Sequence, residues 1–205
     1  MGRREDNRRR RTERLLSEGL ALFREVGFER SSIEQIAARC DVARGTFYLY
    51  FPDKRALFAT LIDQWASPTE RALSDATAGL RSASGTNEAW LAYARMAEAL
   101  ARVGLEHRDA LLVSFGELRS AGEGGELVRA RERRILDQAF AMTRIAAERG
   151  WITAEDPRLV ALIVGGAVER LIWGWLAGDD IGDPMDTAQR VLRFIGRALA
   201  LPDRG

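Results

Sequence analysis

The stretch from Ser31 to Phe58, SSIEQIAARCDVARGTFYLYFPDKRALF, constrains the fold of this chain more than any other part. Ser32 and Gln35 have the spacing of a capping box, so a helix is predicted to begin between them. An apolar face at helical spacing follows, formed by Ile33, Ile36, Ala37 and Cys40. The pattern predicts a short capped helix with one buried face.

A tight turn and a second short helix are predicted next. Asp41-Val42-Ala43 leaves room only for a turn, and Asp can adopt the left-handed conformation that such a turn needs. Arg44 to Tyr50 then forms the second helix, with Phe47 and Phe51 directed inward. Two short helices at this spacing describe a helix-turn-helix, whose second helix enters the major groove of DNA.

Longer helices are predicted on both sides of this motif. Thr12 to Val26 carries a broad apolar stripe, and Gly27 is expected to end that helix in a left-handed conformation. After Pro52, Asp53 can cap a helix that starts at Lys54. This helix is expected to reach about Ala78, with Pro68 either kinking or ending it and a loop following at 79–86.

The run DVARGTFYLYFPDKRALF resembles the signature of TetR-type transcriptional regulators, and the resemblance covers Leu15 to Phe58. Two positions depart from the usual pattern. Asp41 stands where Gly is commonest, which costs turn strain, and Ala43 stands where a Ser would cap the second helix. The missing cap costs about 1 kcal/mol.

Candidate DNA contacts lie on the side of the second helix opposite Phe47. Arg44 suits a bidentate bond to guanine, while the hydroxyls of Thr46 and Tyr48 suit phosphate oxygens and the Tyr48 ring suits a thymine methyl. Gly45 costs about 1 kcal/mol in a helix, and a close approach of backbone to DNA would explain it.

Ser32 and Lys54 each begin a helix, where backbone N–H groups favour a phosphate. Tyr50 is expected to be half-buried, with its hydroxyl at the backbone. The resemblance implies the same DNA-binding roles for Ser32, Arg44, Gly45, Thr46, Tyr48, Tyr50 and Lys54. Leu49 departs from the family, which often has a polar or aromatic residue there. The alternative is that Tyr48 and Tyr50 pack as ordinary core residues.

Charge is distributed unevenly along the chain. Residues 1–60 hold 13 Lys and Arg against 9 Asp and Glu, a net charge of +4, and the remainder holds 18 against 21, a net charge of −3. The basic surplus therefore lies in the segment that contains the motif, as phosphate binding requires. The alternative is that the strong preference for Arg over Lys reflects a genome-wide use of Arg. Residues 1–11, MGRREDNRRRR, are predicted to be a disordered arm that either contacts DNA or is a solvated tail.

Other classes of protein are disfavoured. The single cysteine, Cys40, lies on an inner helix face and fits a reducing cytosol. The only histidine, His107, has no metal-ligand cluster near it, and no phosphate loop or nucleophile elbow is present, so we expect neither catalysis, a metal nor a cofactor. The most apolar segment, Leu159 to Ala177, is interrupted by Glu169-Arg170 and is short of a membrane span. A soluble cytoplasmic protein is expected.

Five more helices are predicted after the loop at 79–86, which makes the chain all-α with no repeat. Their expected ranges are Asn87–Val103, His107–Arg119, Glu126–Arg149, Arg158–Ala177 and Met185–Ala200. A glycine-rich break is expected at Gly122–Gly125. The predicted organisation is a basic arm at 1–11, a helix-turn-helix domain at 12–58 and a C-terminal helical bundle at 59–205.

The helix expected at Arg158–Ala177 is apolar on more than one face and the one at Met185–Ala200 carries an apolar stripe, which favours a subunit interface. The TetR resemblance implies a two-fold homodimer through these helices, and two recognition helices about 34–36 Å apart would then bind a palindrome. The candidate interface residues are Leu162, Gly166, Trp175, Val191, Ile195 and Leu199.

Aromatic and methionine side chains between the motif and this interface suit an adaptable apolar pocket, and equally an ordinary core. The candidates are Trp90, Tyr93, Met96, Phe115, Phe140 and Trp173. The resemblance favours a pocket for a small apolar or amphipathic effector that releases a repressor from DNA. The alternative is an architectural DNA-binding protein with a closed C-terminal core, and nothing in these residues decides between repression and activation.

Overall fold

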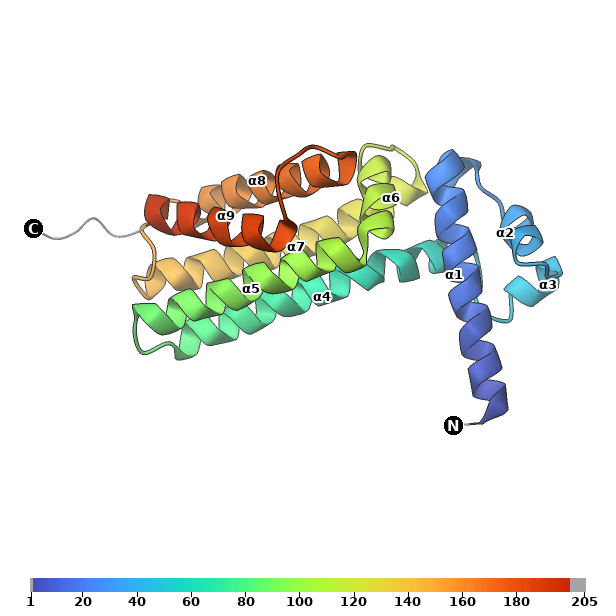
Figure 1. Ribbon diagram of the computed structural model, residues 1–205, viewed down its shortest axis with the longest axis horizontal. Coiled ribbons are helices and arrows are strands. Elements are labelled where there is room, and N and C mark those ends of the chain that lie inside the picture. Colours follow the sequence, from blue (N-terminus) through green and yellow to red (C-terminus); the bar gives the residue numbers. More distant parts are fainter. Residues whose placement is uncertain (1, 200–205) are drawn as a thin grey trace, which may run out of the picture. The chain divides into compact units, whose positions relative to one another are not determined.

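The computed structural model describes residues 2–199 of the chain. Met1 and residues 200–205, the outer ends of the predicted arm and of the predicted C-terminal domain, lie outside the described residues. The described part is all-α, as the sequence predicts (Figure 1). Its helices are α1 (Arg3–Arg30), α2 (Ile33–Arg39), α3 (Arg44–Phe47), α4 (Lys54–Ser82), α5 (Thr86–Glu106), α6 (Arg108–Leu118), α7 (Glu123–Glu148), α8 (Pro157–Ala177) and α9 (Pro184–Leu199).

These helices form two compact units, and neither unit is continuous in sequence. The first contains the chain up to Trp65 together with Asp109–Arg131, and the second contains Ala66–Arg108 together with the chain from Glu132 onward. The predicted domain boundary at residue 58 stays a prediction, and the compact units differ from it in one respect. α6 and the start of α7, which the sequence assigned to the C-terminal bundle, pack with the helix-turn-helix.

The local signals around the motif are confirmed. Ser32 Oγ accepts the N–H of Gln35, and the Gln35 side chain accepts the N–H of Ser32, which completes the predicted capping box of α2. Asp41 has φ 54°, the left-handed turn conformation expected of it. Asp53 Oδ1 accepts the N–H of Ala56 at 2.7 Å and so caps α4.

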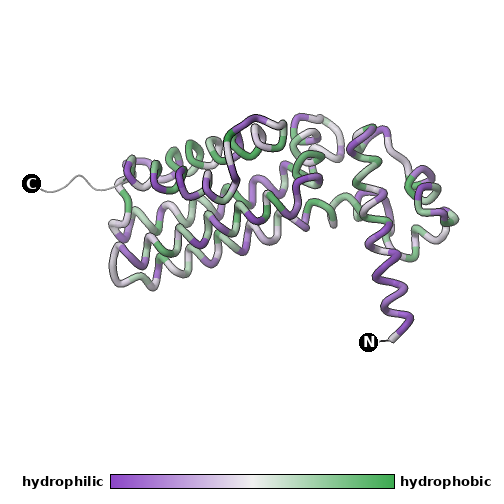
Figure 2. The backbone as a smooth tube through the Cα atoms, in the orientation of Figure 1, coloured by the Kyte–Doolittle hydropathy of each residue, from purple (hydrophilic) through white to green (hydrophobic). Residues whose placement is uncertain are grey.

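The arm is helical, which corrects the prediction of disorder. α1 begins at Arg3 and continues through the arginine-rich segment into the apolar stripe (Figure 2). The predicted end at Gly27 is present as a break with φ 79° and ψ 165°, after which one more turn reaches Arg30. This backbone region is open essentially only to glycine, and it is more extended than the left-handed helix end that the sequence suggests.

Two other glycine and proline signals did not end helices. α4 continues through Pro68 and Gly79 to Ser82, and at Gly79 a β-carbon would come within 2.9 Å of Ala92. Gly79 therefore permits a close approach of α4 and α5 within the second unit. At the predicted break, Gly124 and Gly125 lie in the first turn of α7, where Gly124 packs against Phe28.

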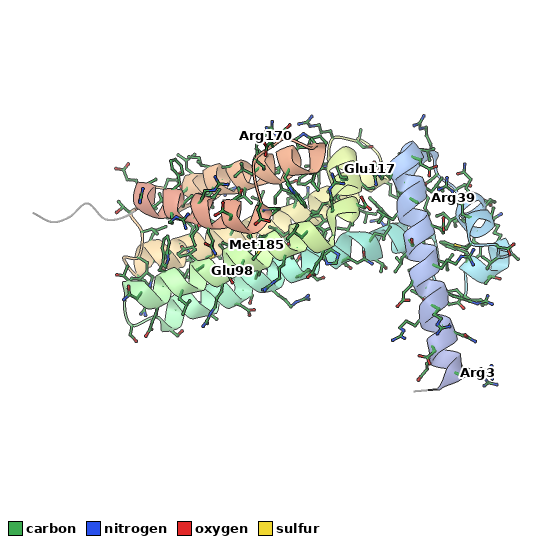
Figure 3. The ribbon with its side chains drawn as sticks, in the orientation of Figure 1. Arg3, Arg39, Glu98, Glu117, Arg170 and Met185 are labelled. Atoms are coloured by element: carbon green, nitrogen blue, oxygen red, sulfur yellow. The ribbon has the colours of Figure 1, made fainter. Side chains whose placement is uncertain are left out.

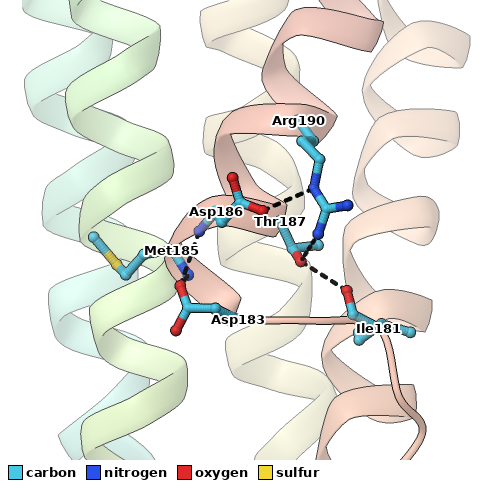
Figure 4. Close-up of polar contacts among 6 residues, drawn as sticks. All are labelled: Ile181, Asp183, Met185, Asp186, Thr187 and Arg190. Atoms are coloured by element: carbon cyan, nitrogen blue, oxygen red, sulfur yellow. Dashed lines mark hydrogen bonds and ion pairs between the residues drawn. The ribbon is translucent and has the colours of Figure 1, made fainter.

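The connection between α8 and α9 is closed by polar contacts (Figure 4). Asp183 Oδ1 accepts the N–H groups of Met185 and Asp186 and so caps α9. The Thr187 hydroxyl donates to the carbonyl of Ile181 at 2.9 Å, and Arg190 pairs with Asp186 at 3.1 Å. Because these caps fix the start of α9, the helix can pack along α5 in the same unit.

Within the second unit, the side chains packed most tightly are at one end of the α4, α5 and α7 bundle. They include Leu73, Ala76, Leu80, Ala89, Ala92, Met142, Ile145 and Ala146. Apolar residues in the middle of α5 and α7 remain partly exposed, among them Met96, Leu100, Ile135 and Phe140. Of these, Met96 and Ile135 pack against the buried cluster.

Candidate nucleic-acid interface

A cluster of phenylalanines supports the motif from behind. Phe23, Phe28 and Phe58 pack at ring-centroid distances of 4.9–5.6 Å, and each is nearly inaccessible to solvent. Phe47, the predicted inward residue of α3, is fully buried, and Phe51 is also in the core. Burying a large aromatic side chain stabilises a fold by roughly 1.5–3 kcal/mol. The short helix α3 is therefore held by its side chains more than by its own hydrogen bonds.

α3 is shorter than predicted. The α-helix ends at Phe47, and the chain continues to Phe51 in tight turns, with N–H to carbonyl bonds from Leu49 to Thr46 and from Tyr50 to Phe47. Ala43 makes no side-chain cap at its start. The missing cap and the glycine both disfavour a regular helix here, and the proline that follows prevents it from continuing.

Arg44 and Tyr48, the two strongest predicted DNA contacts, lie together on the exposed face of this segment. Arg44 Nη2 donates to the Tyr48 hydroxyl at 3.1 Å, and the guanidinium lies 5.8 Å from the Tyr48 ring centroid. The same guanidinium pairs with Glu34 of α2 at 2.9 Å. The hydrogen bond to Tyr48, and then the charge of Glu34, raise the pKa of Arg44 above its ordinary value.

Glu34 is a charged neighbour of the candidate site that the sequence analysis missed. Its own backbone N–H and then the charge of Arg44 hold its pKa below the usual range, so it is ionised at neutral pH. The two residues are ten positions apart, on separate helices, so no helical spacing links them. Only the packing of α2 against α3 brings the carboxylate to the guanidinium.

The other predicted contacts of α3 are placed as follows. A β-carbon at Gly45 would meet nothing within 4 Å, so this glycine is not required by packing within the chain. Thr46 and Tyr50 are half-buried, and the structure therefore gives Tyr50 the expected intermediate exposure. Leu49 has 72% of its surface exposed, the largest fraction of any apolar side chain of the motif.

Lys54 does not point outward as predicted. Its Nζ donates to the carbonyls of Phe28 (2.5 Å) and Ser31 (2.9 Å) and lies 4.2 Å from the Phe28 ring centroid. Burial lowers the pKa of the ammonium, and the nearby carboxylates of Glu29, Glu123 and Glu117 partly offset this effect. The geometry does not support a direct phosphate contact by the side chain, because the ammonium ties the α1–α2 connection to the start of α4.

A buried carboxylate holds the same connection from the other side. Glu117 of α6 accepts the N–H of Phe28 at 2.7 Å, immediately after the break at Gly27 (Figure 3). Glu29 accepts the N–H of Gly124, and Arg24 pairs with Asp109 at 3.0 Å. These contacts explain why α6 and the start of α7 belong to the unit that contains the motif.

Residues 15–61 match the family model described as bacterial regulatory proteins of the tetR family. This segment, which contains the helix-turn-helix, is therefore a TetR-family DNA-binding region. The matched region includes α2, α3 and the first turns of α4, the part whose geometry is described above.

Curated proteins with similar sequences agree with this family match. The HTH-type transcriptional regulator YuxN of Bacillus subtilis is 30% identical over 104 residues, which cover 50% of this chain and 33% of YuxN. The chain thus spans a third or less of the length of the curated relatives that it matches. Each of these relatives is named as an HTH-type transcriptional regulator.

Solved structures of TetR-like fold cover nearly the whole chain. The TetR-family regulator PfmR of Thermus thermophilus is 21% identical, with a TM-score of 0.69 and coverage of 92% of this chain and 98% of PfmR. FadR of Bacillus subtilis, solved in complex with stearoyl-CoA, is 19% identical, with a TM-score of 0.66 and coverage of 91% and 98%. At these identities the likeness shows the fold alone.

The predicted pocket residues do not all lie in one unit. Phe115 lies in the first unit, whereas Trp90, Tyr93, Met96, Phe140 and Trp173 lie in the second. Tyr93 and Met96 pack against the buried core, and burial raises the pKa of Tyr93 to about 12. Trp90 packs on α9, since any side chain at Gly196 would collide with its ring. Trp173 has 41% of its surface exposed.

Two buried oxygen atoms in the second unit have no hydrogen-bond partner among the described residues. They are Oε1 of Glu70 on α4 and Oε1 of Gln138 on α7. The other carboxylate oxygen of Glu70 is 3.3 Å from Nη2 of Arg134, one helical turn before Gln138. The sequence analysis did not identify either residue.

An apolar face of α8 and α9 is open to solvent. Leu162, a predicted interface residue, is half-exposed, and Leu159, Ile163 and Phe194 are exposed still more. Val191, Ile195 and Leu199 are half-buried, and Gly166 is exposed. Trp175 is turned inward: Arg108 lies 5.8 Å from its ring centroid, and the ring edge reaches Gly104. Phe194, with 74% of its surface exposed, is an outward aromatic residue of this face that the sequence analysis did not name.

By length and composition, α8 is also the one helix in the described part of the chain that is long and apolar enough to cross a membrane. Only 17% of its most apolar window is buried within the chain. The same helix carries the charged pair Glu169 and Arg170, both exposed, and Arg170 lies 3.7 Å from Asp179. These charges fit a helix covered by protein better than one surrounded by lipid.

Proposed function

We propose that this chain is a soluble, cytoplasmic transcriptional regulator that binds a specific DNA site through α2 and α3. The observation that supports this most directly is the exposed pair Arg44 and Tyr48, held in place by Glu34 on a buried phenylalanine base. Arg44 would bond a guanine, and the Tyr48 hydroxyl a phosphate. Leu49, also exposed, suits a thymine methyl.

Ser32, Gly45, Thr46, Tyr50 and Lys54 complete the proposed interface with different roles. Ser32 caps α2 and so directs its first backbone N–H groups toward a phosphate. Gly45 lets the backbone approach the duplex, and Thr46 offers a hydroxyl. Tyr50 and Lys54 fix the geometry from inside the motif.

Selection of bound DNA from a random duplex pool tests this proposal. The parent protein is compared with Arg44→Ala, Tyr48→Ala and, as a matched control, Arg102→Ala, which removes an exposed arginine of the second unit. We expect the parent and the control to enrich one sequence and both motif variants to lose it. Equal retention of all sequences by the parent would exclude a specific regulator.

We further propose that the protein is a homodimer that uses the exposed face of α8 and α9. An apolar helix face of this size is costly to leave in water and is typical of a subunit interface. Two recognition segments related by a two-fold axis would bind a palindromic operator. The selected sequence should therefore be an inverted repeat.

The effector site is proposed for the second unit. The partly exposed apolar residues along α5 and α7 suit an apolar or amphipathic molecule, and the buried oxygens of Glu70 and Gln138 would accept hydrogen bonds from its polar end. FadR of Bacillus subtilis, which has a similar fold, was solved with stearoyl-CoA. Ligand binding is expected to favour a conformation with lower DNA affinity, which makes the protein a repressor.

Displacement of the operator by small molecules tests the effector and the direction of its effect. Fatty acyl thioesters and hydrophobic amines are added to the protein–operator complex, and the same ligands are then added to Gln138→Leu. Release from the parent and retention by the variant are expected. If no ligand alters DNA binding, an architectural protein with a closed core becomes the better description.

A further inference from the structure

The arginine-rich start of α1 separates its charges onto two sides. At 3.6 residues per turn, six arginines fall within an arc of about 160°. They are Arg3, Arg4, Arg8, Arg10, Arg11 and Arg14. Glu5, Asp6 and Glu13 lie on the opposite side, and Arg9 is the one arginine among them. Arg9 contacts Asp6 at 3.7 Å and Glu13 at 3.8 Å.

None of the six arginines of this cationic stripe has an ion-pair partner within residues 2–199. In the structure the acidic residues of the segment have other partners: Asp6 and Glu13 pair with Arg9, and Glu5 accepts the N–H of Gly2. The six arginines are therefore left unpaired although exposed helices gain from pairing opposite charges at a spacing of three or four. The stripe therefore has the composition of a surface that binds an anionic partner.

The stripe continues the side of α1 that packs against the motif. Leu15 and Leu22 are buried on that side, and Arg4, Arg8 and Arg11 precede them at helical spacing. Cys40, the last residue before the α2–α3 turn, donates its thiol to the carbonyl of Arg14. The stripe thus starts beside the turn that leads into α3 and extends beyond it by roughly 16 Å, the rise of eleven helical residues.

We propose that this cationic stripe is a preformed second DNA-binding element that lies along the phosphates flanking the bases contacted by α3. The inference rests on the proposed DNA-binding function and adds a separate surface to it. Duplex DNA carries one negative charge per ~1.7 Å of its axis, so a stripe of this length faces several phosphates. Such contacts position the protein and strengthen binding without reading sequence.

The stripe is helical before any partner binds, which distinguishes it from a flexible arm. Its arginines belong to a helix that is already formed in the free protein (Figure 3 labels Arg3 at its start). Binding therefore does not have to order the backbone, a cost of about 1–2 kcal/mol per residue for a disordered segment. The effect of the stripe should accordingly be large for its size.

The test measures the salt dependence of binding to the selected operator. The stripe variant carries Arg3→Gln, Arg4→Gln, Arg8→Gln, Arg10→Gln and Arg11→Gln, changes that keep helix propensity nearly constant. The control variant carries five changes of the same kind at exposed arginines of the second unit: Arg71→Gln, Arg95→Gln, Arg102→Gln, Arg133→Gln and Arg158→Gln. Both variants have the same net charge.

We expect the plot of log affinity against log salt to become less steep by about 0.9 for each phosphate that the stripe variant no longer neutralises. The selected sequence should stay the same, and the control should keep the slope of the parent. The difference should disappear on a duplex trimmed to the bases under α3. Equal slopes for the two variants on the full duplex would overturn the inference.

Two further outcomes separate this inference from its alternatives. If the parent selects no sequence, the proposed function fails, while the slopes on any long duplex still test the stripe. The second outcome comes from a separate experiment, which measures binding of the parent and the stripe variant to vesicles that contain anionic phospholipid. Loss of vesicle binding by the stripe variant with an unchanged DNA slope would assign the stripe to a membrane surface and overturn the proposal.

Discussion

At the residue scale, Glu34 controls how available Arg44 is. The two side chains form an exposed ion pair, a contact that solvent screens strongly. DNA binding must either weaken this pair or keep it as a brace that orients the guanidinium. In both cases Glu34 places a negative charge beside the phosphates, which opposes binding to any sequence.

Glu34→Gln is therefore expected to raise affinity for unrelated DNA by about two- to fivefold, because it removes one negative charge beside the phosphates. Affinity for the operator should rise less, because Arg44 loses its orienting partner. The measurement is fluorescence anisotropy with operator and scrambled duplexes at one salt concentration. An unchanged ratio of the two affinities would show that Glu34 does not contribute to specificity.

Tyr93 gives the fold a dependence on alkaline pH. Burial raises its pKa from the ordinary 10.0 to about 12, so the native protein keeps the phenolic proton where the unfolded chain has lost it. The unfolded state binds fewer protons in this window, so the free energy of unfolding falls as pH rises from 10 to 12, by ~3 kcal/mol at most. Tyr93→Phe should remove this contribution. Urea unfolding of both proteins across the window checks it, and parallel pH profiles would contradict the assignment.

At the element scale, we expect Gly45 to make the short α3 segment less stable and to favour its binding to DNA. The free protein has open space around Gly45, so the added methyl of Gly45→Ala should stabilise the segment by up to about 1 kcal/mol. If the backbone approaches DNA closely here, the same methyl should weaken operator binding by at least tenfold. Thermal unfolding and anisotropy measured on one preparation test both effects. Unchanged operator affinity would show that the glycine is not there for DNA.

α6 acts as a brace for the α1–α2 connection. Glu117 is 8% exposed and accepts the N–H of Phe28 beside the break at Gly27. Glu117→Ala leaves that buried donor unpaired and is expected to lower the free energy of unfolding by about 1–3 kcal/mol. Glu126→Ala, an exposed site on α7, is the control and should change stability by less than about 0.5 kcal/mol. Denaturant unfolding measures both, and equal losses would refute the brace.

At the scale of the whole molecule, the exposed apolar face of α8 and α9 is the proposed dimer interface. Ile163→Glu combined with Phe194→Glu places charge on that face without touching the core, since both side chains are more than half-exposed. Sedimentation should show a dimeric parent and a monomeric variant. The variant should keep its helical content and lose affinity for the palindrome while still binding a half-site weakly. A dimeric variant would move the interface elsewhere.

Local chemistry made much of the fold predictable from sequence. Capping by Ser32 and Asp53, the left-handed Asp41 and the apolar spacing of the helices depend on residues within a few positions of one another. The predicted helix ranges after residue 86 match the observed ones closely for the same reason. Arg44 and Tyr48 share one turn of chain, so their proximity also followed from the sequence.

What the sequence could not decide depends on contacts between distant segments. Glycines at Gly79 and Gly124 remained helical because neighbouring elements pack closely on them, and Lys54 turned inward because the carbonyls of the α1–α2 connection were within its reach. The pairing of Glu34 with Arg44 and of Glu117 with Phe28 likewise requires separate helices to meet. The sequence by itself determined the helices, their caps and the motif, since these are local. Tertiary structure alone decided which side chains support the interface and which units the helices join, because packing selects among many contacts that local chemistry allows equally.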